Sequence, residues 1–298
     1  MKKIISIFLI FTLTISASAF CSFAASASET NASATEDALT DASADDTAAG
    51  TSDASASDSE ETEAEVFETK SGKLTLEDYS RLEIEKESYE VTEDEAKEYA
   101  DSVLKSYFGG DDEFTPTDEM AKQYAEENLD NEINNLDEFY EFTHNYLETN
   151  ALQNALFEKL LEKSEIIEYN TEIYENVEDY YYDNLTYYAV RSSSFDPDTF
   201  AKANGYESAD AYKKEATENV MSKIMVLEKV ADDLGIEITE EDENEIVTEY
   251  LVSIGYEEVY TPEEFIQQCG EGWLYILTGL NLLYERVMTA LEPYAVVE

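Results

Sequence analysis

Apolar residues recur at intervals of three or four along most of the chain beyond residue 92, which is the spacing of amphipathic helices. Thr92 and Glu95 form a capping box ahead of the first of these segments, and Gly109 and Gly110 end it. The longest apolar stripe runs over residues 136–161. The pattern predicts a mainly α protein with long helices.

Helix-start signals divide the rest of the chain into further helices. Each combines a capping side chain with a proline or acidic residue in the first turn, and they fall at Asp196, Ser208, Thr239 and Thr261. Gly235 ends the helix that Ser208 begins, and Trp273 opens an apolar stripe that reaches Leu291. We expect Trp273 to anchor this last helix in the core.

A short β segment precedes the helices. Leu82 and Ile84 alternate with Glu83 and Glu85, which is typical of a half-buried strand. The folded part is predicted to span residues 70–298, long enough for a sizeable core.

Residues 28–69 differ in composition from the folded part. They are dominated by Ala, Ser, Thr, Asp and Glu, and no Lys or Arg lies between residue 28 and Lys70. Such a segment buries too little apolar surface to offset its ordering entropy. We expect a disordered, acidic linker.

Residues 1–27 have the order of a secretory signal peptide. Lys2 and Lys3 precede an apolar run, and small residues suited to cleavage follow. Cys21 raises the alternative of a lipid anchor, but the bulky Phe20 before it departs from a lipoprotein signal. We expect a secreted or cell-surface protein without a membrane span.

The charge balance excludes several functions. With 70 acidic and 18 basic side chains, the formal net charge is -52, opposite to what phosphate neutralisation in nucleic-acid binding requires. His144 is the single histidine, and the cysteines are Cys21 and Cys269. These counts argue against a multi-histidine or cysteine-based metal site. We predict no cofactor.

The order of segments in the folded part resembles the C-terminal, chaperone-arm region of the trigger factor family of bacterial folding chaperones. The segments that carry the resemblance are residues 76–79, 82–86, 91–95, 117–122, 136–139, 154–160, 164–166, 200–205, 212–216, 227–231 and 234–242. The peptide-binding core of periplasmic chaperones of the SurA type is similar in pattern. The resemblance implies a long-helix, arm-bearing domain with a short N-terminal β segment.

Two departures from that family change what the resemblance implies. The basic ribosome-docking domain has no counterpart, since the arginines are Arg81, Arg191 and Arg286. Only residues 108–116 stand where the family's prolyl isomerase module would lie. The resemblance therefore implies a chaperone that holds unfolded polypeptides, without ribosome binding and without isomerase activity.

Aromatic residues are the candidates for contact with such polypeptides. Three consecutive tyrosines on one helix cannot all face one core, because neighbours diverge by about 100°. The candidate peptide-binding residues are Tyr180, Tyr181, Tyr182, Tyr187, Tyr188, Phe195 and Tyr206. The alternative is that most of them are ordinary core or boundary residues.

The sequence leaves two functions open. The first is an ATP-independent holdase that binds non-native chains in a cleft between helical arms. The second is a structural or adhesive surface protein that uses the same helices as a fixed scaffold.

Overall fold

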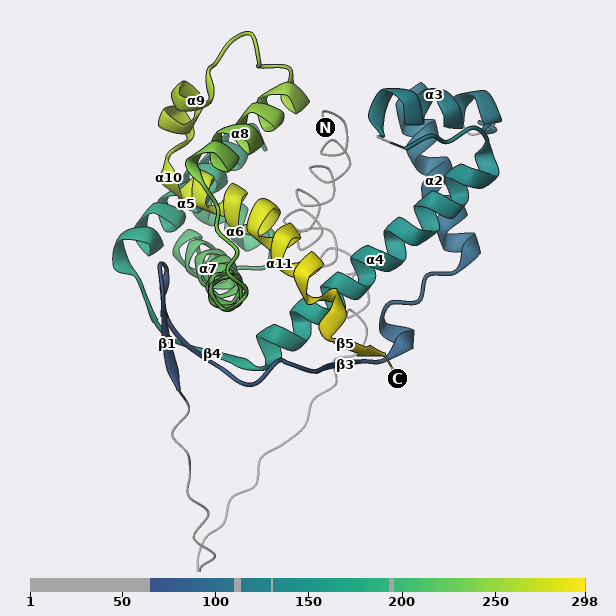
Figure 1. The fold of residues 1–298 in the computed structure, drawn as a ribbon. Helices are drawn as coiled ribbons and strands as arrows, with labels where there is room; N and C mark the ends of the chain where they lie inside the picture. The colour runs from purple at the N-terminus through teal and green to yellow at the C-terminus, as the bar shows by residue number, and fades with distance from the viewer. Residues whose placement is uncertain (1–64, 110–113, 130, 193–195, 298) are drawn as a thin grey trace, which may run out of the picture.

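The computed structural model describes residues 65–109, 114–129, 131–192 and 196–297. The predicted signal peptide with Cys21, and the predicted linker up to residue 64, lie outside the described residues. The described chain is mainly α, as predicted, with short strands (Figure 1).

A three-stranded antiparallel sheet opens the described chain. Its order is β1-β2-β4, with strands Val66–Thr69, Gly72–Leu76 and Ser164–Tyr169. Strand β1 lies inside the range predicted as linker, because Phe67 pairs with Leu74 and packs against the main core. The ordered part thus extends further toward the N-terminus than residue 70.

The first arm consists of helices α2 (Glu93–Phe108), α3 (Asp118–Asn128) and the first half of α4 (Leu136–Glu162). The three helices share a separate apolar core, formed by Ala100, Leu104, Ala121, Tyr124, Ala125, Leu129, Ile133 and Phe139. The single histidine, His144, lies at the boundary of this arm, with its Nε2 2.7 Å from the carbonyl oxygen of Val91. This agrees with a packing role.

The body lies between the two arms. It joins the sheet to the second half of α4, to α7 (Ala209–Leu234) and to α11 (Tyr284–Leu291). Strand β3 (Leu82–Ile84) is part of it and pairs in parallel with the C-terminal strand β5 (Ala295–Val297). The sequence predicted β3 but gave no sign of its partner.

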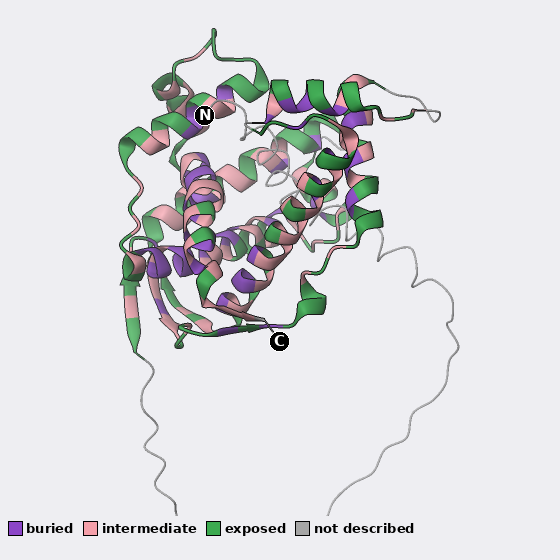
Figure 2. Ribbon diagram, turned by 45° about the vertical axis from the view of Figure 1, so that its right-hand side comes forward, coloured by how far each residue is buried: buried purple, intermediate pink, exposed green. Residues whose placement is uncertain are grey.

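The second arm lies on the other side of the body (Figure 1). Helices α5 (Thr171–Arg191) and α6 (Pro197–Ala203) pack against α7. Helices α8 (Glu240–Ile254), α9 (Pro262–Cys269) and α10 (Glu271–Leu277) share a second apolar cluster, and α10 packs against α5. Figure 2 shows buried residues on the faces where these helices meet and exposed residues on the outside.

The helix starts occur where the sequence predicted them. Thr92, Thr239 and Thr261 each complete a capping box, and the side chains of Asp196 and Ser208 accept hydrogen bonds from backbone N–H groups. Trp273 is buried in the second arm, as expected.

The C-terminal helical stretch is continuous from Glu271 to Leu291, but it is not uniform. Residues Thr278–Leu283 form a π-helical segment, η2, between α10 and α11. A β-carbon on Gly279 would lie 2.5 Å from Cδ1 of Ile224 on α7. The absence of a side chain at Gly279 therefore allows η2 to approach α7 closely.

A second close approach sets the position of α5. A β-carbon added to Gly272 of α10 would lie only 2.1 Å from the carbonyl oxygen of Asn176 on α5. We expect Gly272→Ala to destabilise the protein by about 1–3 kcal/mol, because the backbone of α5 would have to shift. Urea denaturation measures this change.

Ser253→Ala is the control for this substitution. Ser253 is exposed on α8, and its hydroxyl bonds only the carbonyl of Tyr250 in its own helix. Its free energy of unfolding should change by no more than about 0.5 kcal/mol. If the Gly272→Ala and Ser253→Ala proteins were equally stable, the close approach of α10 to the backbone of α5 at Gly272 would be contradicted.

Candidate functional site

Helix α5 carries five of the seven predicted site residues. It begins at the Asn170 cap, whose side-chain oxygen accepts hydrogen bonds from the backbone N–H groups of Glu172 and Ile173 at 3.1 and 3.4 Å. Its buried residues are Val177, Leu185 and Ala189, four or eight positions apart. This narrow buried stripe leaves other faces of α5 free for additional contacts.

Tyr180 and Tyr181 meet edge to face, with ring centroids 5.5 Å apart, and each also packs against a different cluster of the second arm. Tyr180 packs with the apolar cluster of α8, α9 and α10, whereas Tyr181 lies against Tyr212 of α7, with ring centroids 6.3 Å apart. Burial raises the pKa of both hydroxyl groups. These two rings hold the second arm together rather than offering a surface.

The remaining tyrosines of α5 are exposed. Tyr182, Tyr187 and Tyr188 expose 41%, 48% and 54% of their surface, and Val190 exposes 54%. The rings of Tyr187 and Tyr188 meet edge to face, with centroids 5.4 Å apart. As the sequence predicted, part of this aromatic cluster faces away from the core.

Cations lie over two of these exposed rings. The Arg191 guanidinium is 4.5 Å from the Tyr187 ring centroid, and the Lys213 ammonium is 5.6 Å from that of Tyr182. Such contacts restrict the rings without covering their whole faces.

Tyr206 does not join this surface. Tyr206 is half-buried and packs against Tyr212, with ring centroids 5.0 Å apart. Phe195 lies outside the described residues. Within the described chain, the exposed part of the predicted site is therefore Tyr182, Tyr187 and Tyr188.

Sequence reasoning missed a second exposed apolar group on this arm. It lies at the end of α8 and in the connection to α9, and it consists of Val252, Ile254, Tyr256 and Val259. One feature of the sequence could have predicted this group. After the buried Leu251, apolar residues follow at every second position (Val252, Ile254 and Tyr256), and this alternation departs from the three-to-four spacing of a helix that buries one face.

The C-terminal end of α5 lies close to α8. Burial raises the pKa of Tyr250 on α8, and the neighbouring Cys269 and Tyr188 add to the shift. Tyr188 therefore lies near the edge of the α8–α10 cluster, whereas Tyr182 lies beside Lys213 of α7. We call Tyr182, Tyr187, Tyr188 and Val190 the α5 surface.

Carboxylates dominate the rest of this arm. The sequence has no Lys, Arg or His between Lys229 and Arg286, whereas acidic residues recur through α8 and α9. Arg286 pairs with Asp242, at the start of α8, through two hydrogen bonds. The arm thus presents apolar residues within a strongly negative surface.

A cavity of about 390 Å³ lies away from the α5 surface. Residues of the β1–β2 turn, α7, α8 and the α10–η2 stretch line it, and Tyr275 is the aromatic residue in its wall. The predicted cleft lined by the aromatic candidates does not coincide with this cavity.

Within the residues that the structure describes, no group of three or more His, Cys, Asp or Glu side chains is placed to hold a metal ion. None of the described helices combines the length and the hydrophobicity needed to cross a membrane.

No protein-family model and no curated protein matches the chain. The resemblance to the trigger factor family therefore stays a prediction.

The neighbours Tyr181 and Tyr182 should respond very differently to truncation. We expect Tyr181→Ala to cost about 3 kcal/mol of unfolding free energy, because a buried aromatic ring is lost. Tyr182→Ala should cost about 0.5 kcal/mol or less. Thermal or urea denaturation of the two variants measures the difference, and equal losses would show that Tyr182 is also a core residue.

Glu249 on α8 provides a test of the repulsion between neighbouring carboxylates on the second arm. Burial raises its pKa, and the nearby charges of Glu245 and Glu285 raise it further. Because the pKa of Glu249 is raised, the folded state binds a proton at this carboxylate more readily than the unfolded state does. Protonation of Glu249 therefore stabilises the folded protein in acid, and this stabilisation is lost as the pH rises through the raised pKa.

We therefore expect Glu249→Gln to be more stable than the natural protein at neutral pH and to lose the advantage in acid. Urea midpoints over a pH series measure this change. The control is Glu98→Gln, an exposed carboxylate on the first arm. A Glu249→Gln advantage that grows as the pH falls would refute the assignment.

Proposed function

We propose that this protein is an exported, ATP-independent holdase that binds non-native polypeptides on its second arm. The observation that carries the proposal is the α5 surface, where three tyrosines and a valine of one helix are exposed and the rings of Tyr187 and Tyr188 meet edge to face. Exposed apolar residues rimmed by charge are typical of protein interaction sites.

The chemistry of these residues suits clients of varied sequence. A tyrosine ring offers a large apolar area at low entropic cost, and its hydroxyl tolerates water. Neighbouring rings such as Tyr187 and Tyr188 can receive apolar side chains of many shapes. Binding of this kind needs no single sequence motif in the client.

The negative charge of the protein protects an exposed apolar surface. With a net charge of -52, copies of the chain repel one another, which opposes association through the α5 surface. A bound client shares this charge and stays dispersed. The sequence contains no Gly-x-x-x-x-Gly-Lys nucleotide loop, so release in this proposal follows from dissociation alone.

The short connection between α2 and α3 also bears on the proposal. Helix α2 ends at Phe108 and α3 begins at Asp118, which leaves too few residues for a prolyl isomerase module. The proposed activity is therefore holding alone.

The test is suppression of aggregation when an unfolded client is diluted into buffer with a several-fold molar excess of this protein. We expect the natural chain to suppress light scattering. The triple variant Tyr182→Ser/Tyr187→Ser/Tyr188→Ser should bind the client about tenfold more weakly or worse. The reason is that a few aromatic residues commonly contribute most of the binding energy of an interface.

The matched control is Val66→Ser/Ile167→Ser. These residues expose 50% and 51% of their surface but lie on strands β1 and β4. The control should retain suppression. No suppression by the natural chain would sink the holdase proposal, and binding of one folded target but not of unfolded chains would indicate an adhesive protein instead.

A further inference from the structure

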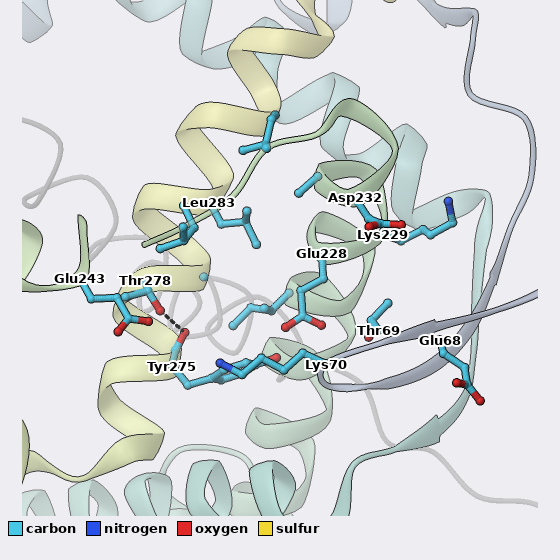
Figure 3. A pocket seen from close by; sticks show the side chains of 15 residues that line it. Glu68, Thr69, Lys70, Glu228, Lys229, Asp232, Glu243, Tyr275, Thr278 and Leu283 are labelled. Carbon is cyan, nitrogen blue, oxygen red and sulfur yellow. Dashed lines mark hydrogen bonds between the residues drawn. The ribbon is translucent and has the colours of Figure 1, made fainter. Parts of the chain in front are cut away.

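The cavity beside the β1–β2 turn has the size of a small-molecule site. Its volume is about 390 Å³, within the range of ligand pockets. Figure 3 shows side chains from the turn, from α7 and from the α10–η2 stretch converging on it. It lies apart from the α5 surface and has no part in the proposed holdase activity.

One wall of the cavity is apolar. It is formed by Ile224, Ala231, Ile236, Ile238, Gly279 and Leu283. Two of these residues belong to the π-helical segment η2, and Gly279 lies against Ile224. Single π-helical turns occur frequently at functional sites.

Glu228 presents a fixed carboxylate to this cavity. Its Oε1 accepts a hydrogen bond from the Ser71 hydroxyl at 2.7 Å, and its Oε2 accepts one from the Ser71 backbone N–H at 3.1 Å. Tyr275 donates in turn to the Ser71 hydroxyl oxygen at 2.6 Å. Each carboxylate oxygen keeps further capacity to accept a hydrogen bond.

The charge of Glu228 is incompletely balanced. Burial raises the pKa of this carboxyl group, while hydrogen bonds from Ser71 and Thr69 and the charge of Lys70 oppose the shift. Within residues 65–109, 114–129, 131–192 and 196–297, no salt bridge to Glu228 forms. A cation entering the cavity would therefore meet a carboxylate held in place by neutral donors.

The cavity rim adds to this negative potential. Glu68, Asp232 and Glu243 lie on it, against Lys70 and Lys229. Two of these charges are already engaged: Glu68 pairs with Lys73, and Lys229 pairs with Asp233 and lies 4.2 Å from the Phe67 ring centroid. An apolar wall combined with a surplus of carboxylates fits an organic cation.

We propose that this cavity binds a small organic ammonium ion, whose charged group pairs with Glu228 and whose apolar part lies against Ile224 and Leu283. The ligand would bridge the β1–β2 turn, α7 and η2. The apolar wall distinguishes such a ligand from a simple inorganic cation.

The test uses the full chain and n-hexylammonium as the probe, with binding measured by calorimetry and by NMR. We expect one saturable site. Hexanol has the same apolar part without the charge, and methylammonium has the charge without the apolar part. Each should bind about tenfold more weakly, because each lacks one of the two contacts.

Two variants locate the site. Glu228→Gln keeps the shape of the side chain and should weaken n-hexylammonium binding about tenfold or more, while leaving hexanol binding unchanged. Ala231→Leu places a larger side chain in the cavity and should weaken both probes. Glu98→Gln, a remote exposed carboxylate, should bind as the natural protein does.

Circular dichroism and a melting curve establish that each variant is folded. The proposal is overturned if n-hexylammonium binds no more tightly than hexanol or methylammonium, or if folded Glu228→Gln and Glu98→Gln bind it equally. Equal binding of n-hexylammonium by the Glu228→Gln and Glu98→Gln variants would mean that the acidic surface attracts amines in general, without a site at Glu228. None of these outcomes affects the holdase proposal, whose variants lie on α5.

Discussion

The long helix α4 has to bury its apolar side chains in two separate places. Near its start, Phe139 belongs to the core of the first arm, whereas Leu156, Phe157 and Leu160 belong to the core of the body. One rigid helix thus fixes the first arm at a distance from the body. The sheet, α7 and α11 then assemble on its second half, and the second arm is built on α7.

The helices of this protein could be predicted because their signals are local. A cap such as Thr92 with Glu95, or Thr261 with Pro262, lies within a few residues of the helix that it starts. The strand pairs are different. Strand β3 pairs with β5 near the other end of the chain, and no local pattern identifies such a partner. The η2 segment was missed because its sequence is that of an ordinary helix.

The candidate surface could be predicted only in part, for a similar reason. Helical geometry shows that Tyr180, Tyr181 and Tyr182 point in different directions. Which of them is covered depends on α7 to α10, whose packing positions are not encoded in α5 itself. The exposed residues after Leu251 were missed because an apolar residue in a connection is commonly assumed to be buried.

The extreme acidity and the exposed aromatic residues belong together. A strongly charged chain tolerates apolar surface that would make a neutral protein associate. Its few cations are used for specific contacts, as with Arg286 at the start of α8 and Lys229 beside Phe67. The many carboxylates thus give the chain its strong negative charge, while these two bases each contact a specific partner.

The pairing of β3 with β5 has a consequence for biosynthesis. Leu82 lies opposite Ala295, and the core of the body includes Val287, Met288 and Leu291. A nascent chain therefore cannot complete this core until nearly all of these residues have left the ribosome. Until then the core of the body stays open, and its apolar side chains remain exposed to water.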